Sequence, residues 1–111
     1  MWVGRGEPDR RRELFGGVGE VRVWNMMDGA LPPFECVLGC ELDAGGSVGA
    51  HVQQECTEIV IVTDGRGHAR VGQASIPLSP GVVVRLPFGE TLALRNASDT
   101  DVLRYFIVKA R

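Results

Sequence analysis

Three side chains in the middle of the chain, His51, Gln53 and Glu58, have the types and the spacing of a chemical site. His51 and Gln53 are two residues apart, so on a strand they point to the same side. Glu58 follows after a short bend and begins the next strand-like segment. An imidazole, an amide and a carboxylate that converge in this way can hold a divalent metal or act as an acid–base pair.

Regularly spaced glycines, a proline and an asparagine surround these side chains. From Gly45 to Gly65 the pattern is Gly, five residues, His, one residue, Gln, four residues, Glu, six residues, Gly. From Gly81 to Asn96 it is Gly, five residues, Pro, one residue, Gly, two residues, Leu, three residues, Asn. Proline and glycine restrict how the chain enters a strand, and Asn96 can close the following turn by bonding its own backbone.

The elements that must position these residues are short strands. The chain has 111 residues, which fits one domain, and its 15 glycines and 6 prolines indicate many turns. Turn signals recur about every 8–12 residues, the spacing of a sandwich or barrel. We expect strands at 20–26, 34–42, 47–53, 58–62, 68–71, 74–78, 82–86, 91–96 and 102–109. No stretch has the pattern of a long helix, so the sequence predicts an all-β fold.

The two patterned segments resemble the paired signature motifs of the cupin superfamily, in which every glycine, proline and asparagine spacing matches. The resemblance covers about residues 20–110. It implies a cupin jelly-roll barrel of two antiparallel sheets with Greek-key connections. We expect residues 20–111 to form this barrel and residues 1–19 to form an N-terminal arm that lies over it, with a helix-compatible stretch from Asp9 to Phe15.

The resemblance also implies where a metal would lie, and here the sequence departs from the family. Typical cupins hold a divalent metal with three His and one Glu. His51 and Glu58 match two of these positions, whereas Gln53 and Leu92 replace the other two His. We therefore expect a weak or vestigial metal site of His51, Gln53 and Glu58, no tightly bound cofactor, and at most a weakly held divalent transition metal.

The cysteines and aromatic residues add little to this site. Three cysteines without a Cys-x-x-Cys pair suggest neither a disulfide framework nor a zinc clip. Cys36 and Cys40 share the apolar face of their strand and are expected to pack in the core. Cys56, between Gln53 and Glu58, stays open as a soft third ligand. The remaining expectation is that Trp24, Phe88 and Tyr105 fill the core, with a pocket wall as the alternative.

Three functions are consistent with the sequence. The first is a small-molecule-binding barrel whose cavity is lined by His51, Gln53, Glu58 and Leu92, acting as a sensor or accessory protein. The second is an enzyme, either an isomerase or epimerase or a weak-metal enzyme, with His51 as base and Glu58 orienting it as the catalytic pair. The third is a non-catalytic assembly or interaction barrel. The family resemblance permits the second without establishing it.

Expected partners are a second copy of the chain and a small-molecule ligand. Ile59 and Ile61 must point outward if Glu58 points inward, and such an apolar face predicts a homodimer. The run Arg10–Arg12 is expected to be solvated or to donate salt bridges, and no basic stripe with aromatics indicates nucleic acid. No apolar stretch approaches the roughly 20 residues that span a membrane, and the first residues lack a signal-peptide pattern, so we expect a cytoplasmic protein.

Overall fold

The computed structural model describes residues 6–111, which form strands with one short 3-10 helix. The elements are β1 (Asp9–Arg12), η1 (Leu14–Gly16), β2 (Glu20–Asn25), β3 (Phe34–Leu42), β4 (Ser47–Val52), β5 (Thr57–Asp64), β6 (Gly67–Val71), β7 (Ala74–Leu78), β8 (Val83–Leu86), β9 (Thr91–Asn96) and β10 (Leu103–Ala110). Every expected strand is present, within two residues of its predicted bounds. In this part of the chain no helix is long and apolar enough to cross a membrane.

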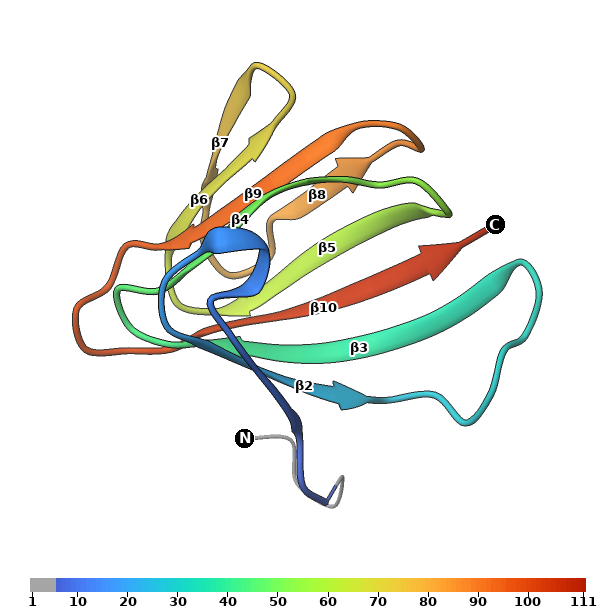
Figure 1. Cartoon of the computed structure of the whole chain (residues 1–111), viewed down its shortest axis with the longest axis horizontal. Coiled ribbons are helices and arrows are strands. Elements are labelled where there is room, and N and C mark those ends of the chain that lie inside the picture. The colour runs from blue at the N-terminus through green and yellow to red at the C-terminus, as the bar shows by residue number, and fades with distance from the viewer. Residues whose placement is uncertain (1–5) are drawn as a thin grey trace.

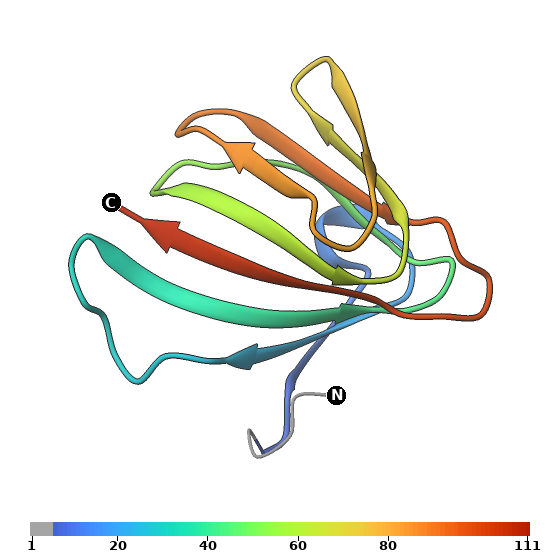
Figure 2. The same ribbon diagram turned by 180° about the vertical axis from the view of Figure 1, so that it is seen from behind.

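The strands form two antiparallel sheets that face each other (Figure 1). The larger sheet has the order β1-β2-β3-β10-β5-β8, and the smaller has the order β4-β9-β6-β7. Figure 2 shows from behind that β2, β3, β10 and β5 lie side by side. Consecutive strands alternate between the two sheets from β3 to β6 and again from β7 to β10, whereas β1 to β3 and the β6–β7 hairpin each stay within one sheet. This arrangement confirms the predicted all-β jelly roll.

The core lies between the sheets and follows the predicted alternation. On β5, Val60 and Val62 are at most 1% exposed and Glu58 shares their inner face at 3%. On β3, Cys40 and Leu42 are equally buried, as the sequence predicts. The prediction that Phe88 fills the core is wrong, because Phe88 lies in the turn after β8 and is 64% exposed.

Asn96, at the end of β9, joins two turns at one end of the barrel. Its Nδ2 donates to the carbonyl oxygens of Leu42, Asp43 and Asp101 at 3.1, 3.0 and 2.8 Å. Its Oδ1 accepts the N–H of Ser98 at 2.9 Å. The bond to Ser98 confirms the predicted local turn closure. The bonds to Leu42 and Asp43 also fix the β3–β4 turn, so one buried amide holds both turns in place.

The expected helix-compatible stretch from Asp9 to Phe15 is wrong, because its first part is a strand. β1 pairs antiparallel with β2 and becomes the edge strand of the larger sheet. The free edge of β2 offers unpaired backbone groups, and a strand satisfies them whereas a helix does not. Residues 1–5 of the expected arm lie outside the described residues.

After β1, the arm turns through η1 and lies against β4 at very short range (Figure 1). A Cβ at Gly49 would lie 1.8 Å from the carbonyl oxygen of Phe15, and one at Gly17 would lie 2.1 Å from that of Ser47. No side chain fits in either place, so glycine is required at both positions. The close approach of these two backbones places Phe15 over the barrel.

The arginine run of β1 donates salt bridges, as expected. Arg10 and Arg12 contact Glu20 at 2.8 and 3.7 Å, and Arg11 contacts Asp9 at 2.8 Å. Glu20 also belongs to a second cluster, centred on Arg22. The Arg22 guanidinium bonds Asp43 at 2.8 Å and Glu20 at 3.1 Å.

Replacing Asn96 tests whether this amide holds the turns. We expect Asn96→Ala to lower the free energy of unfolding by about 2–4 kcal/mol, since several buried groups lose a partner worth about 1 kcal/mol each. Asn96→Asp keeps the acceptor for Ser98 but turns an oxygen toward three carbonyls, so it should destabilise at least as much. Urea denaturation measures both. Equal stability of Asn96→Ala and the natural protein would contradict the assignment.

The Arg22 cluster makes stability depend on acidity. Hydrogen bonding to Arg22 is the main influence that lowers the pKa of Glu20 and of Asp43 below their ordinary values. A carboxyl with a lowered folded-state pKa stabilises above its unfolded pKa, about 4, and loses that contribution as the pH falls through the folded-state pKa. Arg22→Met should therefore be less stable than the natural protein at pH 7, and this difference should shrink below about pH 4. A difference that is constant from pH 7 to pH 2 in denaturation curves would contradict this account.

Candidate functional site

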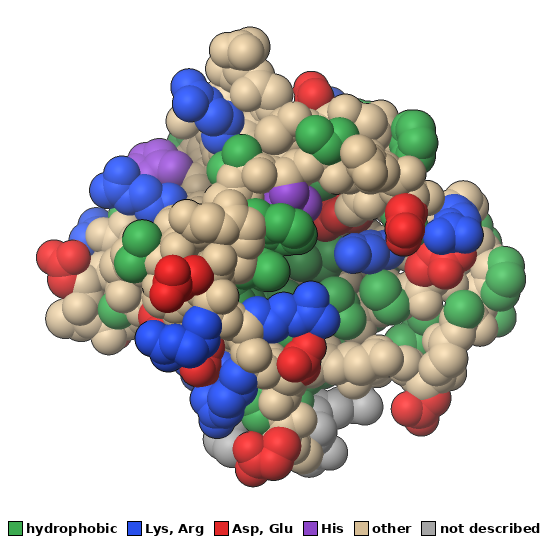
Figure 3. All heavy atoms as spheres, viewed as in Figure 1, with side chains coloured by type: hydrophobic (Ala, Val, Ile, Leu, Met, Phe, Trp, Pro, Cys, Tyr) green, Lys and Arg blue, Asp and Glu red, His purple; other side chains and the backbone are tan. Residues whose placement is uncertain are grey.

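A cavity of about 570 Å³ opens between the two sheets. Its wall is mostly apolar, and Figure 3 shows hydrophobic side chains within the hollow and charged side chains around it. The apolar lining residues are Leu14, Phe15, Val21, Val23, Leu38, Cys40, Val48, Val52, Leu92, Leu94, Tyr105 and Ile107. A cavity of this size with a few polar groups is typical of small-molecule sites.

The structure brings all four predicted site residues to this cavity. His51 lies on β4, Gln53 follows that strand, Glu58 lies on β5 and Leu92 lies on β9. His51 and Leu92 are direct partners in the β4–β9 pair, so their side chains are neighbours. The cupin-like spacing of the sequence therefore does place these positions together in space.

Gln53 and Glu58 are bonded to each other. The Gln53 amide nitrogen donates to Glu58 Oε1, and both side chains are buried. The Gln53 amide oxygen accepts the backbone N–H groups of Glu55 and Cys56 at 3.3 and 3.4 Å. Since a carboxylate only accepts and a backbone N–H only donates, both ends fix the same orientation of the amide. Gln53 thus bridges the β4–β5 bend to Glu58.

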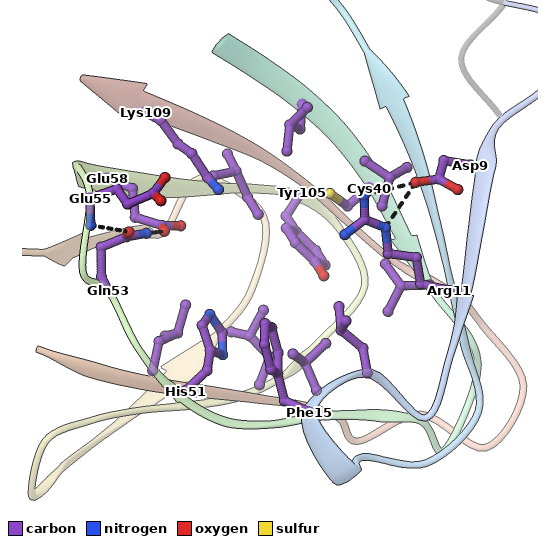
Figure 4. A pocket seen from close by; sticks show the side chains of 18 of the residues that line it. Asp9, Arg11, Phe15, Cys40, His51, Gln53, Glu55, Glu58, Tyr105 and Lys109 are labelled. Atoms are coloured by element: carbon purple, nitrogen blue, oxygen red, sulfur yellow. Dashed lines mark hydrogen bonds and ion pairs between the residues drawn. The ribbon is translucent and has the colours of Figure 1, made fainter. Parts of the chain in front are cut away.

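His51 has a different set of partners from the one we expected. Its Nδ1 lies 3.2 Å from the carbonyl oxygen of Gly49, so Nδ1 carries the proton and Nε2 of a neutral ring is free to accept one. The Phe15 ring stacks on the imidazole, with centroids 4.1 Å apart and an interplanar angle of 14° (Figure 4). We expected Glu58 to orient this ring, but the Gly49 carbonyl does so.

Two residues of the mostly apolar cavity wall, Cys40 and Tyr105, carry an ionisable group that stays protonated near neutral pH. Burial raises the pKa of the Cys40 thiol to about 12, and the nearby Glu58 charge acts in the same direction. Burial also raises the pKa of Tyr105 well above its ordinary value. A protonated thiol is a poor nucleophile. Cys56 is buried, but it is not part of the cavity lining.

Sequence reasoning missed five charged or aromatic lining residues: Asp9, Arg11, Phe15, Glu55 and Lys109. Lys109 had a usable signal, because the alternation Leu103, Tyr105, Ile107 places it on the inner face of its strand. The three arm residues had none, since their position depends on pairing with β2. Figure 4 shows Arg11 and Lys109 pointing into the cavity from different strands.

The donor set does not fit a tightly held transition metal. His51 Nε2 and one free oxygen of Glu58 are available, whereas the Gln53 oxygen already accepts two backbone N–H groups. Leu92 offers no donor. Within residues 6–111, no group of three or more His, Cys, Asp or Glu side chains could hold a metal ion. Catalytic zinc sites usually keep three protein ligands, so we derive no chemical step through a metal.

Comparison with known proteins agrees with the fold and the motif positions. The family model for the cupin domain matches residues 40–109, which is more than half of the chain. The chain belongs to the cupin family. No curated protein matches the sequence significantly.

Several solved structures share this cupin fold. A predicted oxalate decarboxylase from Thermotoga maritima has a TM-score of 0.86 and 23% identity, covering 99% of this chain and 98% of the other. A cupin 2 conserved barrel domain protein from Salinispora arenicola has a TM-score of 0.75 and 24% identity, covering 100% and 87%. KdgF from Halomonas sp. has a TM-score of 0.71 and 16% identity, covering 93% and 86%. At these identities the likeness concerns the fold.

Restoring the two replaced ligands tests the interpretation of the metal site. We expect the natural protein to retain much less than one transition metal per chain after dialysis. Gln53→His with Leu92→His supplies three imidazoles and Glu58, so this variant should retain about one zinc ion per chain. Leu92→His alone, which leaves the Gln53–Glu58 bond intact, is the control. Metal analysis of the dialysed proteins decides, and one tightly held metal per natural chain would show the interpretation to be wrong.

Proposed function

We propose that this cupin binds a small, partly apolar metabolite in its cavity, without a tightly held metal, as a cytoplasmic sensor or accessory protein. The observation that carries the proposal is the hydrogen bond between Gln53 and Glu58. It joins the side chains at two positions that hold metal ligands in typical cupins. What remains is a mostly apolar cavity with polar and charged groups in its wall, as in most small-molecule sites. The free cysteines at positions 36, 40 and 56 support the proposed cytoplasmic location, because disulfides are rare there.

The shape of the site suggests how a ligand would lie. Leu92, only 1% exposed, supplies apolar contact beside His51 where other cupins have an imidazole. Among the four motif positions, His51 Nε2 and the second oxygen of Glu58 are the polar groups left for a ligand. The hydrocarbon part would contact the leucines and valines of the wall, and a polar group would face His51.

A second candidate function is a metal-independent isomerase or epimerase. It is favoured by the fixed tautomer of His51, whose Nε2 can take a proton from a substrate held in the cavity. Glu58 would not orient the ring, but its charge would stabilise the imidazolium once formed. The neighbours named oxalate decarboxylase and KdgF support the fold on which such an activity would rest, and their own activities are not transferred.

Two substitutions separate binding from catalysis. Glu58→Gln keeps the shape and can still accept the Gln53 amide, but it removes the charge. For a metabolite identified by thermal-shift screening, a binding role predicts a loss of about 1–3 kcal/mol in affinity by calorimetry. A catalytic role predicts that turnover falls while binding persists. If neither Glu58→Gln nor His51→Ala alters binding or turnover, the cavity is a remnant and the assembly function takes its place.

The outer face of the larger sheet supports a homodimer. Ile59 and Ile61 of β5 are only half-buried and lie beside Val108 and Phe106 of β10 in register. Val37 of β3 continues this row across the sheet. We propose that a second copy covers this apolar surface by packing sheet against sheet.

The dimer is tested by its mass. Light scattering at micromolar concentration should give about 24 kDa, twice the chain mass of 12.0 kDa. Ile59→Lys places a charge on the outer apolar face and should shift the mass toward a single chain, because burying an unpaired charge is costly. Arg70→Gln, at an exposed position on β6 of the smaller sheet and so away from this face, is the control. A natural protein of 12 kDa would refute the proposal.

A further inference from the structure

The cavity contains two cationic side chains that the proposed function does not use, Lys109 and Arg11. They come from opposite parts of the sequence and from different strands, β10 and β1. Every other arginine of residues 6–111 lies outside the cavity lining. Three carboxylates, Asp9, Glu55 and Glu58, also line the cavity, so a ligand can use the two cations only where these carboxylates do not already occupy them.

Lys109 lies at the polar end of the cavity and has a free ammonium group. It is the only lysine in the chain and follows Tyr105 and Ile107 on the inner face of β10. Its cross-strand partners are Cys36 on β3 and Glu58 on β5. Although Lys109 is half-buried, its ammonium group makes no hydrogen bond or ion pair within residues 6–111. A lysine ammonium has three donors, so this position calls for an acceptor from outside the chain.

Arg11 reaches the same cavity from β1. Its partner in the β1–β2 pair is Val21, a core residue, so the side chain points inward whereas Arg10 and Arg12 do not. Its Nε and Nη2 both contact Asp9 Oδ2 at 2.8 Å. Asp9 therefore orients the guanidinium while leaving Nη1 without a partner among the described residues.

The three carboxylates that line the cavity leave these cations partly available. Asp9 pairs with Nε and Nη2 of Arg11, whose side chain is 53% exposed, and one oxygen of Glu58 accepts the Gln53 amide. The Glu55 carboxylate is 78% exposed and lies 3.9 Å from Arg111. Figure 4 shows Glu58 on one side of the cavity, Arg11 on the other, and Lys109 reaching in between. A ligand's negative group that contacts Lys109 from the side facing Arg11 would thus lie away from Glu58.

We infer, building on the proposed cavity-binding function, that the ligand is a small carboxylic acid with a hydrocarbon body, and that Lys109 and Arg11 bind its carboxylate. Charge-assisted N–H···O bonds from an ammonium and a guanidinium are the strong contacts a carboxylate can make. The hydrocarbon body packs on the apolar wall, chiefly Leu38, Leu94 and Ile107. A ligand with an ammonium group in the same place would be repelled by both cations.

A matched set of six-carbon probes tests this charge preference. Hexanoate, 1-hexanol and hexylamine have the same hydrocarbon body and differ in the head group. We expect hexanoate to bind the natural protein at least about tenfold more tightly than either of the others, as one or two charged hydrogen bonds would give. Titration calorimetry, or chemical-shift changes where binding is weak, measures the three dissociation constants.

Substitutions identify the cations responsible. Lys109→Met keeps an unbranched apolar stem and Arg11→Gln keeps a polar one, and each should weaken hexanoate binding about tenfold while leaving 1-hexanol unchanged. Lys109→Arg retains the charge and should recover most of the affinity. Arg70→Gln is the matched control, since Arg70 is exposed on β6 of the smaller sheet and outside the cavity. Thermal denaturation confirms that each variant is folded.

The single lysine also gives a direct site readout. Reductive methylation with ¹³C-formaldehyde keeps the positive charge and labels Lys109 and the chain's α-amino group. Hexanoate should shift the dimethyl-lysine signal in proportion to binding, and this shift identifies ligand next to Lys109.

The outcomes separate failure of the carboxylate inference from failure of the proposed cavity-binding function. If 1-hexanol or hexylamine binds as tightly as hexanoate, or if Lys109→Met binds hexanoate as the natural protein does, the carboxylate inference is overturned and cavity binding stands. If none of the three probes binds or shifts the Lys109 signal, both the inference and the cavity-binding function are wrong.

Discussion

The hydrogen bonds of Asn96 are the constraint on which the rest of the barrel depends. This one buried amide joins the turn that follows β3 to the turn that follows β9. Because β4 begins directly after the first of these turns, the contact sets where β4 lies against β9. A register shift between Val48 and His51 then brings His51, rather than Ala50, opposite Leu92. The geometry of the site thus depends both on the turns that Asn96 holds at the far end of β9 and on this irregularity in β4.

In the candidate site, two buried polar side chains satisfy each other. In a cupin with all four ligands, a metal neutralises the buried carboxylate. Here the Gln53 amide takes that place for Glu58, and two backbone N–H groups satisfy the amide in turn. A buried carboxylate with a hydrogen-bond partner is far less costly than an orphaned one. The barrel can therefore keep Glu58 in its interior without an ion.

Much of the fold and part of the site could be predicted from the sequence. The strands follow from period-two alternation and turn residues, both local properties, and the spacing of glycines places His51, Gln53, Glu58 and Leu92 on adjacent strands. The bond between Gln53 and Glu58 could not be predicted, because it depends on the shape of the bend between two strands.

The arm was mispredicted for a related reason. The segment from Asp9 to Phe15 is locally compatible with a helix. Only pairing with the free edge of β2 makes its first part, β1, a strand. Without that pairing nothing in the sequence indicates that Arg11 and Phe15 reach the cavity. The position of Lys109, by contrast, could have been predicted, because the alternation of residues along β10 is enough to orient its side chain inward.

Residues from both ends of the described chain form the cavity wall. Binding of a ligand in the cavity is therefore linked to folding of the whole barrel. Arg11 and Phe15 come from its first elements and Lys109 from its last strand, so no internal fragment contains the complete wall. A ligand that needs all of them binds the native state alone. At a hundred times its dissociation constant it would stabilise that state by about 2.7 kcal/mol. Cellular levels of the protein would then follow the supply of its ligand, because unliganded chains unfold and are degraded more often.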